Sequence, residues 1–208
     1  MRASLKKIID NILFPIKALF VSEESISFLT SLRDERFQKV AVFCSGKVLD
    51  IGCGRGSLFI NRFIGKENGI GIDVFEYEGV ENVIKDLANL PYQDNSFDTV
   101  TLIAVGGYIP RNKREMEFSE FVRVLKSGGK LIMTEGERFT QLIGHKWRRF
   151  SLSLVGRVDM DSERGMEEEE YCMPYDEIVK YLNTSPLKLI HRKKFMWGLN
   201  NIYIAVKD

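Results

Sequence analysis

The stretch "KVLDIGCGRGS", Lys47 to Ser57, ends a short apolar run with an aspartate and three glycines. Such a run is typical of a buried strand, and the residues after it have the pattern of a helix. Glycine tolerates positive φ and lets a ligand approach the backbone closely. The free N–H groups at the start of a helix add a partial positive charge. The stretch therefore predicts a strand, a glycine loop and a helix that together bind a nucleotide-like ligand.

Two details of this stretch separate the enzyme families that use such a loop. A dinucleotide-binding loop has G-x-G-x-x-G spacing, whereas Ser57 stands where this chain would need its third glycine. Asp50 places a carboxylate at the strand tip, which suits a cationic group better than a phosphate. The pattern favours a ligand that carries a charged amine.

Short apolar runs alternate with helical stretches along the rest of the chain. The runs "GIGID", "VENVIKD", "FDTVTLIAV" and "GKLIMTEG" read as strands, and "GSLFINRFIG" and "RNKREMEFSEFVRVLKSGG" read as helices. This alternation predicts an α/β fold whose mostly parallel sheet has helices on both faces. A helix from about Pro174 to Asn183 precedes "LKLIHRKKFMW", a "GLNN" turn and "IYIAVKD". Two strands joined so tightly must be antiparallel.

The N-terminal part is expected to be helical. Residues 1–43 form a predicted extension of the same domain, with a second helix from about Glu23 to Phe43 and Ser22 as its cap. Charged residues and a proline interrupt the apolar positions of residues 4–20, which excludes a signal peptide and a membrane span. This helix either packs on its own domain or covers the pocket, or it makes weak contact with a membrane surface.

Composition describes one ordinary globular domain. The chain has 208 residues, 44% hydrophobic and 28% charged, with a net charge of +1. No overall field therefore favours nucleic acid. Three unclustered cysteines indicate a reducing, cytoplasmic compartment and provide no zinc spacing. With only two histidines, no metal site is expected.

Further motifs follow the glycine loop in a fixed order. Asp73 ends "GIGID" and can accept both hydroxyls of a ribose, as it would in an NAD site too. Asp86 in "IKDLANLPY" follows the third strand and can accept from an exocyclic amine. "LPYQDNSFDTVTLI" then leads into the fourth strand, and "EFVRVLKSGGKLIMTE" gives a helix, a glycine turn and the fifth strand.

With these motifs in this order, the chain resembles a class I S-adenosylmethionine-dependent methyltransferase. The resemblance is strong from Lys47 to Glu135 and looser over the final helix and hairpin. It implies a Rossmann-like, seven-stranded sheet in a methyltransferase domain that spans 44–208. It also implies that S-adenosylmethionine is the cofactor, and that residues 137–173 are an insertion on the substrate side.

The resemblance implies a set of cofactor-binding residues: Asp50, Gly52, Cys53, Gly54, Gly56, Asp73, Val74, Asp86, Leu87 and Ala104. The glycines and the cysteine would lie against methionine and ribose, and the first aspartate would orient their loop or meet the amine through water. Asp73 would hold the ribose hydroxyls. Asp86 would meet the adenine amine, with Val74 and Leu87 beside the adenine ring. The alanine would offer its carbonyl to the methionine amine. Singly, Asp50 could cap the loop and Asp86 a turn.

The acceptor side carries fewer signals. The segment "AVGGYIP" after the fourth strand lacks the Asn-Pro-Pro-Tyr signature, and Tyr108 either lines the opening or packs beneath the next helix. A hydroxyl acceptor needs a base, for which His145 is a better candidate than His191 in the hairpin. Two basic runs, "KWRR" and "HRKK", either hold an anionic substrate or form a solvated face.

These observations predict methyl transfer to a small-molecule acceptor that is lipid-like, a sugar or an anionic metabolite. A nucleic-acid substrate is not expected, because no extended patch interleaves aromatic with basic residues. A non-catalytic partner or scaffold that binds S-adenosylmethionine stays open as an alternative. A nicotinamide-dependent oxidoreductase fits the spacing at Ser57 and the carboxylate of Asp86 less well.

Overall fold

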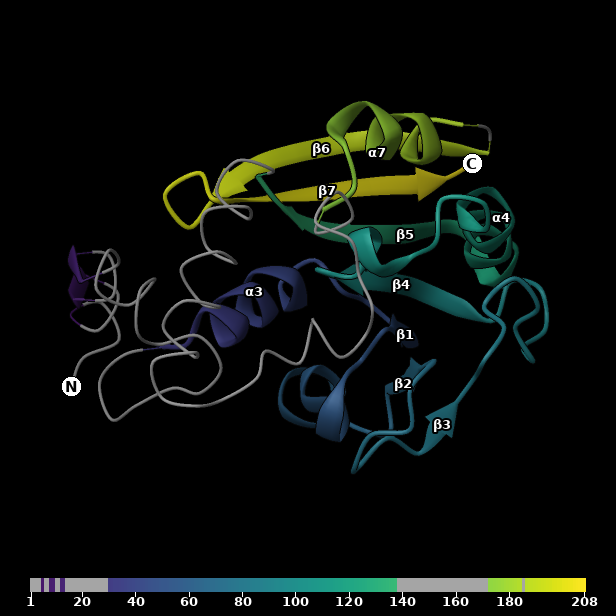
Figure 1. The fold of residues 1–208 in the computed structure, drawn as a ribbon, viewed down its shortest axis with the longest axis horizontal. Coiled ribbons are helices and arrows are strands. Elements are labelled where there is room, and N and C mark those ends of the chain that lie inside the picture. Colours follow the sequence, from purple (N-terminus) through teal and green to yellow (C-terminus); the bar gives the residue numbers. More distant parts are fainter. Residues whose placement is uncertain (1–4, 6–7, 10–11, 14–29, 138–171, 185) are drawn as a thin grey trace.

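The computed structural model describes residues 5, 8–9, 12–13, 30–137, 172–184 and 186–208, which build a seven-stranded sheet (Figure 1). Its strands are β1 (Val48–Ile51), β2 (Gly69–Asp73), β3 (Asn82–Val83), β4 (Phe97–Ile103), β5 (Leu125–Gly136), β6 (Leu187–Phe195) and β7 (Asn200–Lys207). Their order in the sheet is β3-β2-β1-β4-β5-β7-β6. The first five strands pair in parallel, and β7 runs antiparallel to both β5 and β6. The predicted mostly parallel sheet with a closing antiparallel hairpin is confirmed.

Helices cover both faces of the sheet, as β5 shows residue by residue. Leu131 and Met133 pack in the core beneath α4 (Arg114–Val124) and α7 (Tyr175–Leu182). Ile132, between them, packs in the opposite core beneath α3 (Leu32–Ala41). Successive side chains of a strand point to opposite faces, so a strand covered on both sides must be apolar throughout.

The parallel pairing brings several chain segments to one edge of the sheet. The carboxyl ends of β1, β2, β4 and β5 meet there, because parallel neighbours end on the same side. Since β7 is antiparallel, its first residue, Asn200, lies opposite Gly136, the last residue of β5. The same edge therefore carries the glycine loop, the segment after β4 and the start of β7.

The helix predicted from Glu23 to Phe43 is not continuous, because residues 30 and 31 are not helical. Helix α3 starts at Leu32, and Ser31 before it is the N-cap, whose side chain accepts a hydrogen bond from the Asp34 N–H at 3.0 Å. A serine cap with acidic residues in the first turn stabilises this start. The predicted cap Ser22 lies outside the described residues, as do most of residues 4–20.

Two other elements are less regular than the sequence pattern indicated. The stretch read as one helix after the glycine loop consists of a 3₁₀ turn, Arg55–Ser57, and a π-helix, Ile60–Ile64. Gly56 has φ 74°, which no regular helix contains. The strand predicted over "VENVIKD" is only β3, because this exposed edge segment has a single neighbouring strand.

The closing hairpin turns slightly earlier than predicted. Strand β6 ends at Phe195, and the turn over 196–199 contains Met196 and Trp197, both at positive φ, so β7 begins at Asn200. Within the described ranges, no helix has both the length and the apolar character that crossing a bilayer requires.

A buried arginine joins α4 to α7. Arg114 is 1% exposed; its Nε donates to the Ile109 carbonyl at 2.8 Å and its Nη1 to Glu177 Oε2 at 2.7 Å.

Arg114→Met should lower the free energy of unfolding by about 3–5 kcal/mol, because a buried carbonyl and a carboxylate lose their partner. Urea denaturation measures the loss. Arg111→Met, at an exposed position, should change stability by less than about 0.5 kcal/mol; equal losses would contradict the role of Arg114.

Candidate functional site

The glycine loop follows β1 and packs against β2 and the segment after β4. The N–H groups of Gly52 and Cys53 both donate to the Ile72 carbonyl of β2, at 2.9 and 3.0 Å. Gly52 has φ 70°, and a Cβ there would lie 2.6 Å from Val105 Cγ2. Gly54 has φ 65°, but a Cβ there would meet no atom of the described residues within 4 Å. Packing against the segment after β4 thus requires Gly52 to be glycine, whereas Gly54 presents its backbone to open space.

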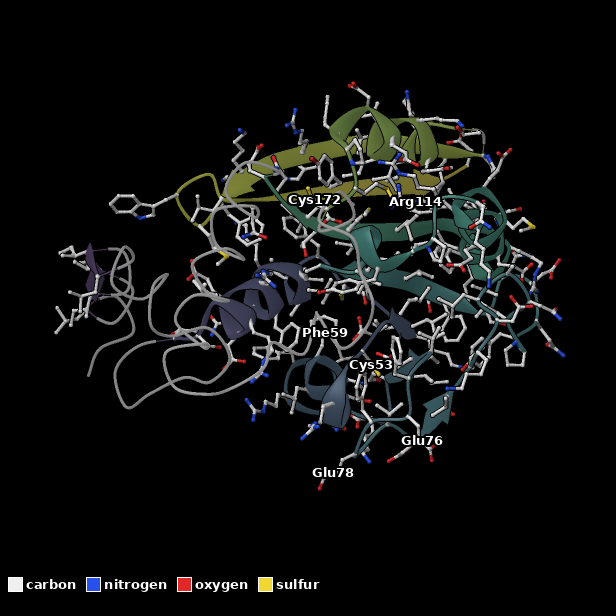
Figure 2. The ribbon with its side chains drawn as sticks, in the orientation of Figure 1. Cys53, Phe59, Glu76, Glu78, Arg114 and Cys172 are labelled. Atoms are coloured by element: carbon white, nitrogen blue, oxygen red, sulfur yellow. The ribbon has the colours of Figure 1, made fainter. Side chains whose placement is uncertain are left out.

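The far side of the loop is closed by the segment after β2. The Gly56 N–H donates to the Glu78 carbonyl at 2.8 Å, and Figure 2 places Glu76 and Glu78 beside the loop that carries Cys53. The Cys53 Sγ lies 3.2 Å from Ser57 Oγ, and burial raises the pKa of this thiol to about 12. Cys53 is therefore a neutral, packed thiol of the loop.

Asp73 joins the glycine loop to the end of β2. Its Oδ2 accepts from the Gly54 N–H at 2.9 Å and its Oδ1 from the Phe75 N–H at 3.0 Å. The residue is 6% exposed. Since each carboxylate oxygen has two lone pairs, each retains one acceptor site for a further donor. Sequence reasoning identified this residue, and the structure places its carboxylate at the loop.

Asp50 lies deeper than the sequence pattern indicated. Its Oδ1 accepts from Thr101 Oγ1 of β4 at 2.7 Å, and the residue is 2% exposed. Burial raises the pKa of this carboxyl to about 7, against the opposing effect of the Thr101 hydrogen bond; the nearby Asp73 raises it further. The carboxyl thus lies inside the sheet between β1 and β4, and is not at the strand tip.

The three residues predicted to meet adenine differ in environment. Leu87 is buried in the core beneath α4, and Val74 is half-buried against the same core. Asp86 is exposed, and its Oδ1 accepts from the Ala88 N–H at 3.2 Å, the turn-capping geometry that the sequence left open. Their contacts with a cofactor stay predictions.

The segment after β4 is held tightly against β5. Ala104 has φ 57°, rare for a residue with a Cβ, and its N–H donates to Thr134 at both the carbonyl and Oγ1, at 3.0 and 3.1 Å. A Cβ at Gly106 would lie 2.5 Å from Glu135 Oε2, so close packing explains this glycine. Tyr108 ends the short 3₁₀ turn that follows and is half-buried.

The histidines contribute little to the described site. His145, the base candidate, lies outside the described residues. His191 is on β6, where its ring lies 5.6 Å from that of Phe43. Among the residues that the structure describes, no group of three or more histidine, cysteine, aspartate or glutamate side chains could hold a metal ion.

Sequence reasoning missed Glu135. This residue of β5 is 3% exposed, and its Oε2 has no hydrogen-bond partner among the described residues. Burial raises the pKa of its carboxyl to about 8, although the backbone N–H of Gly136 and the charge of Arg114 lower it. The sequence does show an acidic residue, Glu135, at the end of an apolar strand. The pattern of the strand, however, gave no reason to predict a functional role for Glu135 and not for its neighbours.

Comparisons with known proteins agree on the family. Residues 49–133 match the model of a family described as "Methyltransferase domain". The chain is 36% identical to a tRNA (carboxymethyluridine(34)-5-O)-methyltransferase of Arabidopsis thaliana over 61% of this chain and 34% of that protein. It is 26% identical to a demethylmenaquinone methyltransferase of Bacillus mycoides over 84% of each chain.

The comparison with solved structures covers more of the chain than the sequence comparisons do. A SAM-dependent methyltransferase of Aquifex aeolicus has a TM-score of 0.57 at 14% identity and covers the full length of both chains. At that identity the similarity concerns the fold. The chain spans 34% and 43% of the first two curated relatives that it matches, so the similarity to them is confined to a part of each.

The buried carboxyl of Glu135 predicts a pH dependence of stability. Its pKa is about 8 in the folded protein and near 4.5 in the unfolded chain, so the folded state binds the proton more tightly. The folding stability that the protonated Glu135 carboxyl contributes is fully present below pH 4.5 and is lost as the pH rises through 8. Glu135→Gln should therefore gain stability relative to the unsubstituted protein as the pH rises from 5 to 8.

Urea unfolding at several pH values measures this difference. Glu115→Gln, at an exposed position of α4, provides the matched control and should show a constant difference from the unsubstituted protein over this range. A constant difference for Glu135→Gln as well would contradict the assignment.

Proposed function

We propose that this chain, which contains a class I S-adenosylmethionine-dependent methyltransferase domain, transfers a methyl group from S-adenosylmethionine to a small-molecule acceptor. The observation that carries the proposal is the pairing of Gly54 with Asp73. A glycine that opens its backbone to free space lies beside a carboxylate with unused acceptor sites, at the carboxyl edge of a parallel sheet. Ligands of open α/β sheets bind at this edge.

The residues present at this edge fit the cofactor. The Asp73 oxygens would accept the two ribose hydroxyls, and the open side of Gly54 would receive the sugar and the methionine chain. The half-buried side chain of Val74 would supply apolar surface for an adenine ring, with Leu87 packed in the core behind it. When bound, S-adenosylmethionine supplies an electrophilic methyl group on a positively charged sulfur.

The chain's own contribution is positioning, which supplies much of the rate of an in-line displacement. The double hydrogen bond from the Ala104 N–H to Thr134 holds the residue after β4 at its positive φ, and the Ala104 carbonyl would accept from the methionine amine. The Asp50–Thr101 hydrogen bond fixes β1 against β4 beneath that site. Tyr108 and His145 stay the candidates for a group near the acceptor.

The acceptor is proposed from the chemistry of this chain. The named relatives act on different acceptors, a tRNA uridine in one case and demethylmenaquinone in another. A small molecule, lipid-like, sugar or anionic, agrees with the net charge of +1, which provides little general attraction for RNA.

Substitution of Asp73 tests the cofactor site. Asp73→Asn should weaken S-adenosylmethionine binding about 10- to 100-fold, because hydrogen bonds to a charged group contribute about 1.5–3 kcal/mol. Calorimetric titration measures the affinity, with Glu76→Gln as the control on the exposed neighbouring segment. Equal affinities of the two variants would contradict the role of Asp73.

Transfer itself requires a separate measurement. We expect the protein to move labelled methyl groups from S-adenosylmethionine to a member of a panel of small organic acids, sugars and prenylated quinols, and not to bulk tRNA. Labelling of tRNA alone would overturn the small-molecule proposal. Cofactor binding with no labelled product from either panel would favour the non-catalytic scaffold.

A further inference from the structure

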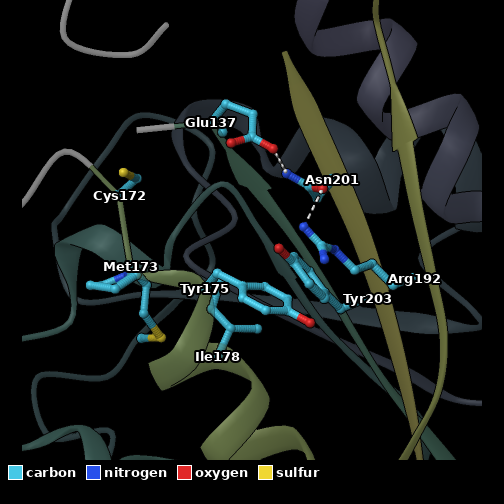
Figure 3. Close-up of a pocket in the computed structure, with 10 residues that line it drawn as sticks. Glu137, Cys172, Met173, Tyr175, Ile178, Arg192, Asn201 and Tyr203 are labelled. Carbon is cyan, nitrogen blue, oxygen red and sulfur yellow. Dashed lines mark hydrogen bonds between the residues drawn. The ribbon is translucent and has the colours of Figure 1, made fainter. Parts of the chain in front are cut away.

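A cavity lies at the same edge of the sheet, between α7 and strands β5 and β7 (Figure 3). Its volume is about 160 Å³. Met173, Ile178 and Tyr203 form an apolar wall and are each no more than 2% exposed. An apolar cavity of about 150 Å³ is large enough to bind benzene. The cavity therefore has the size and lining for one six-membered ring.

The guanidinium group of Arg192 lies at the polar end of the cavity. The Arg192 Cζ lies 4.0 Å from the centre of the Tyr175 ring and 5.7 Å from that of Tyr203. Figure 3 shows the group between these two rings and Asn201. Stacking on tyrosine faces holds a guanidinium in place without using its N–H donors. Within the described ranges, its Nη2 donates to Asn201 Oδ1 at 3.5 Å, and the guanidinium also forms a hydrogen bond with the Tyr203 phenol.

The charges around the cavity leave Arg192 available. Glu137, the carboxylate on the wall, pairs with Lys194 Nζ at 2.7 Å and accepts from Asn201 Nδ2 at 3.1 Å. These partners hold the pKa of Glu137 below its usual range. In the part of the chain that the structure describes, no carboxylate lies within 4.0 Å of the Arg192 guanidinium. Among the described residues, the positive charge of Arg192 thus has no carboxylate in direct contact, and it lies next to a carboxylate, Glu137, that disfavours a dianion such as phosphate.

The cavity adjoins the proposed cofactor site through its wall. Gly136 ends β5, two residues after Thr134, whose backbone and side chain hold Ala104. The Cβ that Gly106 lacks would lie 3.3 Å from Met173 Cβ, so the wall of the cavity contacts the segment after β4.

We propose that this cavity binds a planar aromatic monocarboxylate, with its ring against Met173, Ile178 and Tyr203 and its carboxylate on Arg192. This ligand is the acceptor, or the part of it that anchors it for methyl transfer, and that assignment rests on the proposed function. Tyr203 stays neutral beside the ring, because burial raises the pKa of its phenol to about 12. The ring's flat faces then meet apolar and aromatic surface on the inner side, and the single negative charge meets Arg192.

Benzoate binding to the full-length protein tests the site directly. Ligand-observed NMR titrations would compare benzoate with benzamide, which lacks the charge, and with acetate, which lacks the ring. We expect benzoate to bind at least tenfold more tightly than either. Equal affinities for benzoate and acetate would overturn the proposal, as would the absence of benzoate binding.

Variants locate the binding within the cavity. Arg192→Gln should lose the preference for benzoate over benzamide, and Tyr175→Ala should weaken benzoate binding at least several-fold. Lys193→Gln, a neighbouring exposed position on the opposite face of β6, should bind as the unsubstituted protein does. All three positions are exposed, so the substitutions leave the core intact. Unchanged benzoate binding by Arg192→Gln would contradict the site.

The titrations need no cofactor, which separates this inference from the proposed function. Benzoate binding without S-adenosylmethionine binding would support the cavity site and contradict the methyl transfer. S-adenosylmethionine binding without benzoate binding would support the methyl transfer and contradict the cavity site.

Discussion

The hydrogen bond from the Gly54 N–H to Asp73 joins the carboxyl ends of β1 and β2, and the candidate cofactor site depends on it. It forms because β1 and β2 pair in parallel and therefore end at the same edge of the sheet. The positive φ of Gly54 directs its N–H to the carboxylate and leaves its other side open. One interaction thus orders the loop and presents a partly satisfied carboxylate beside free space.

Strand β5 is the strand at which the sheet changes from parallel to antiparallel pairing. On one side it pairs in parallel with β4, and on the other it pairs antiparallel with β7. The change of direction brings the start of β7, near Asn201, to the carboxyl ends of the parallel strands. As a result, the final hairpin contributes Arg192 and Tyr203 to a cavity beside the segment after β4. The buried carboxyl of Glu135 lies at this boundary, under Gly106, where burial keeps its proton at neutral pH.

Sequence reasoning worked best where structure is local. The mostly parallel sheet and its closing antiparallel hairpin follow from apolar runs and short connections, and the structure confirms them. It failed where packing competes with pattern. One helix was predicted over residues 23–43 with Ser22 as its cap, but Ser31 caps α3 in the middle of this range. The edge strand β3 is short because it has one neighbour. Asp50 was placed at a strand tip, although its hydrogen bond to Thr101 holds it within the sheet.

The sequence by itself determined the fold class and singled out the glycine loop and Asp73, because the pattern of each lies within one short stretch. The hydrogen bond that joins the two was decided by the parallel pairing of β1 and β2. Only the tertiary structure decided that Tyr175, Arg192 and Tyr203 line one cavity and that Glu135 is buried without a partner for Oε2. These residues come from a helix and three strands, and no spacing along the chain records which side chains meet when β7 inserts between β5 and β6.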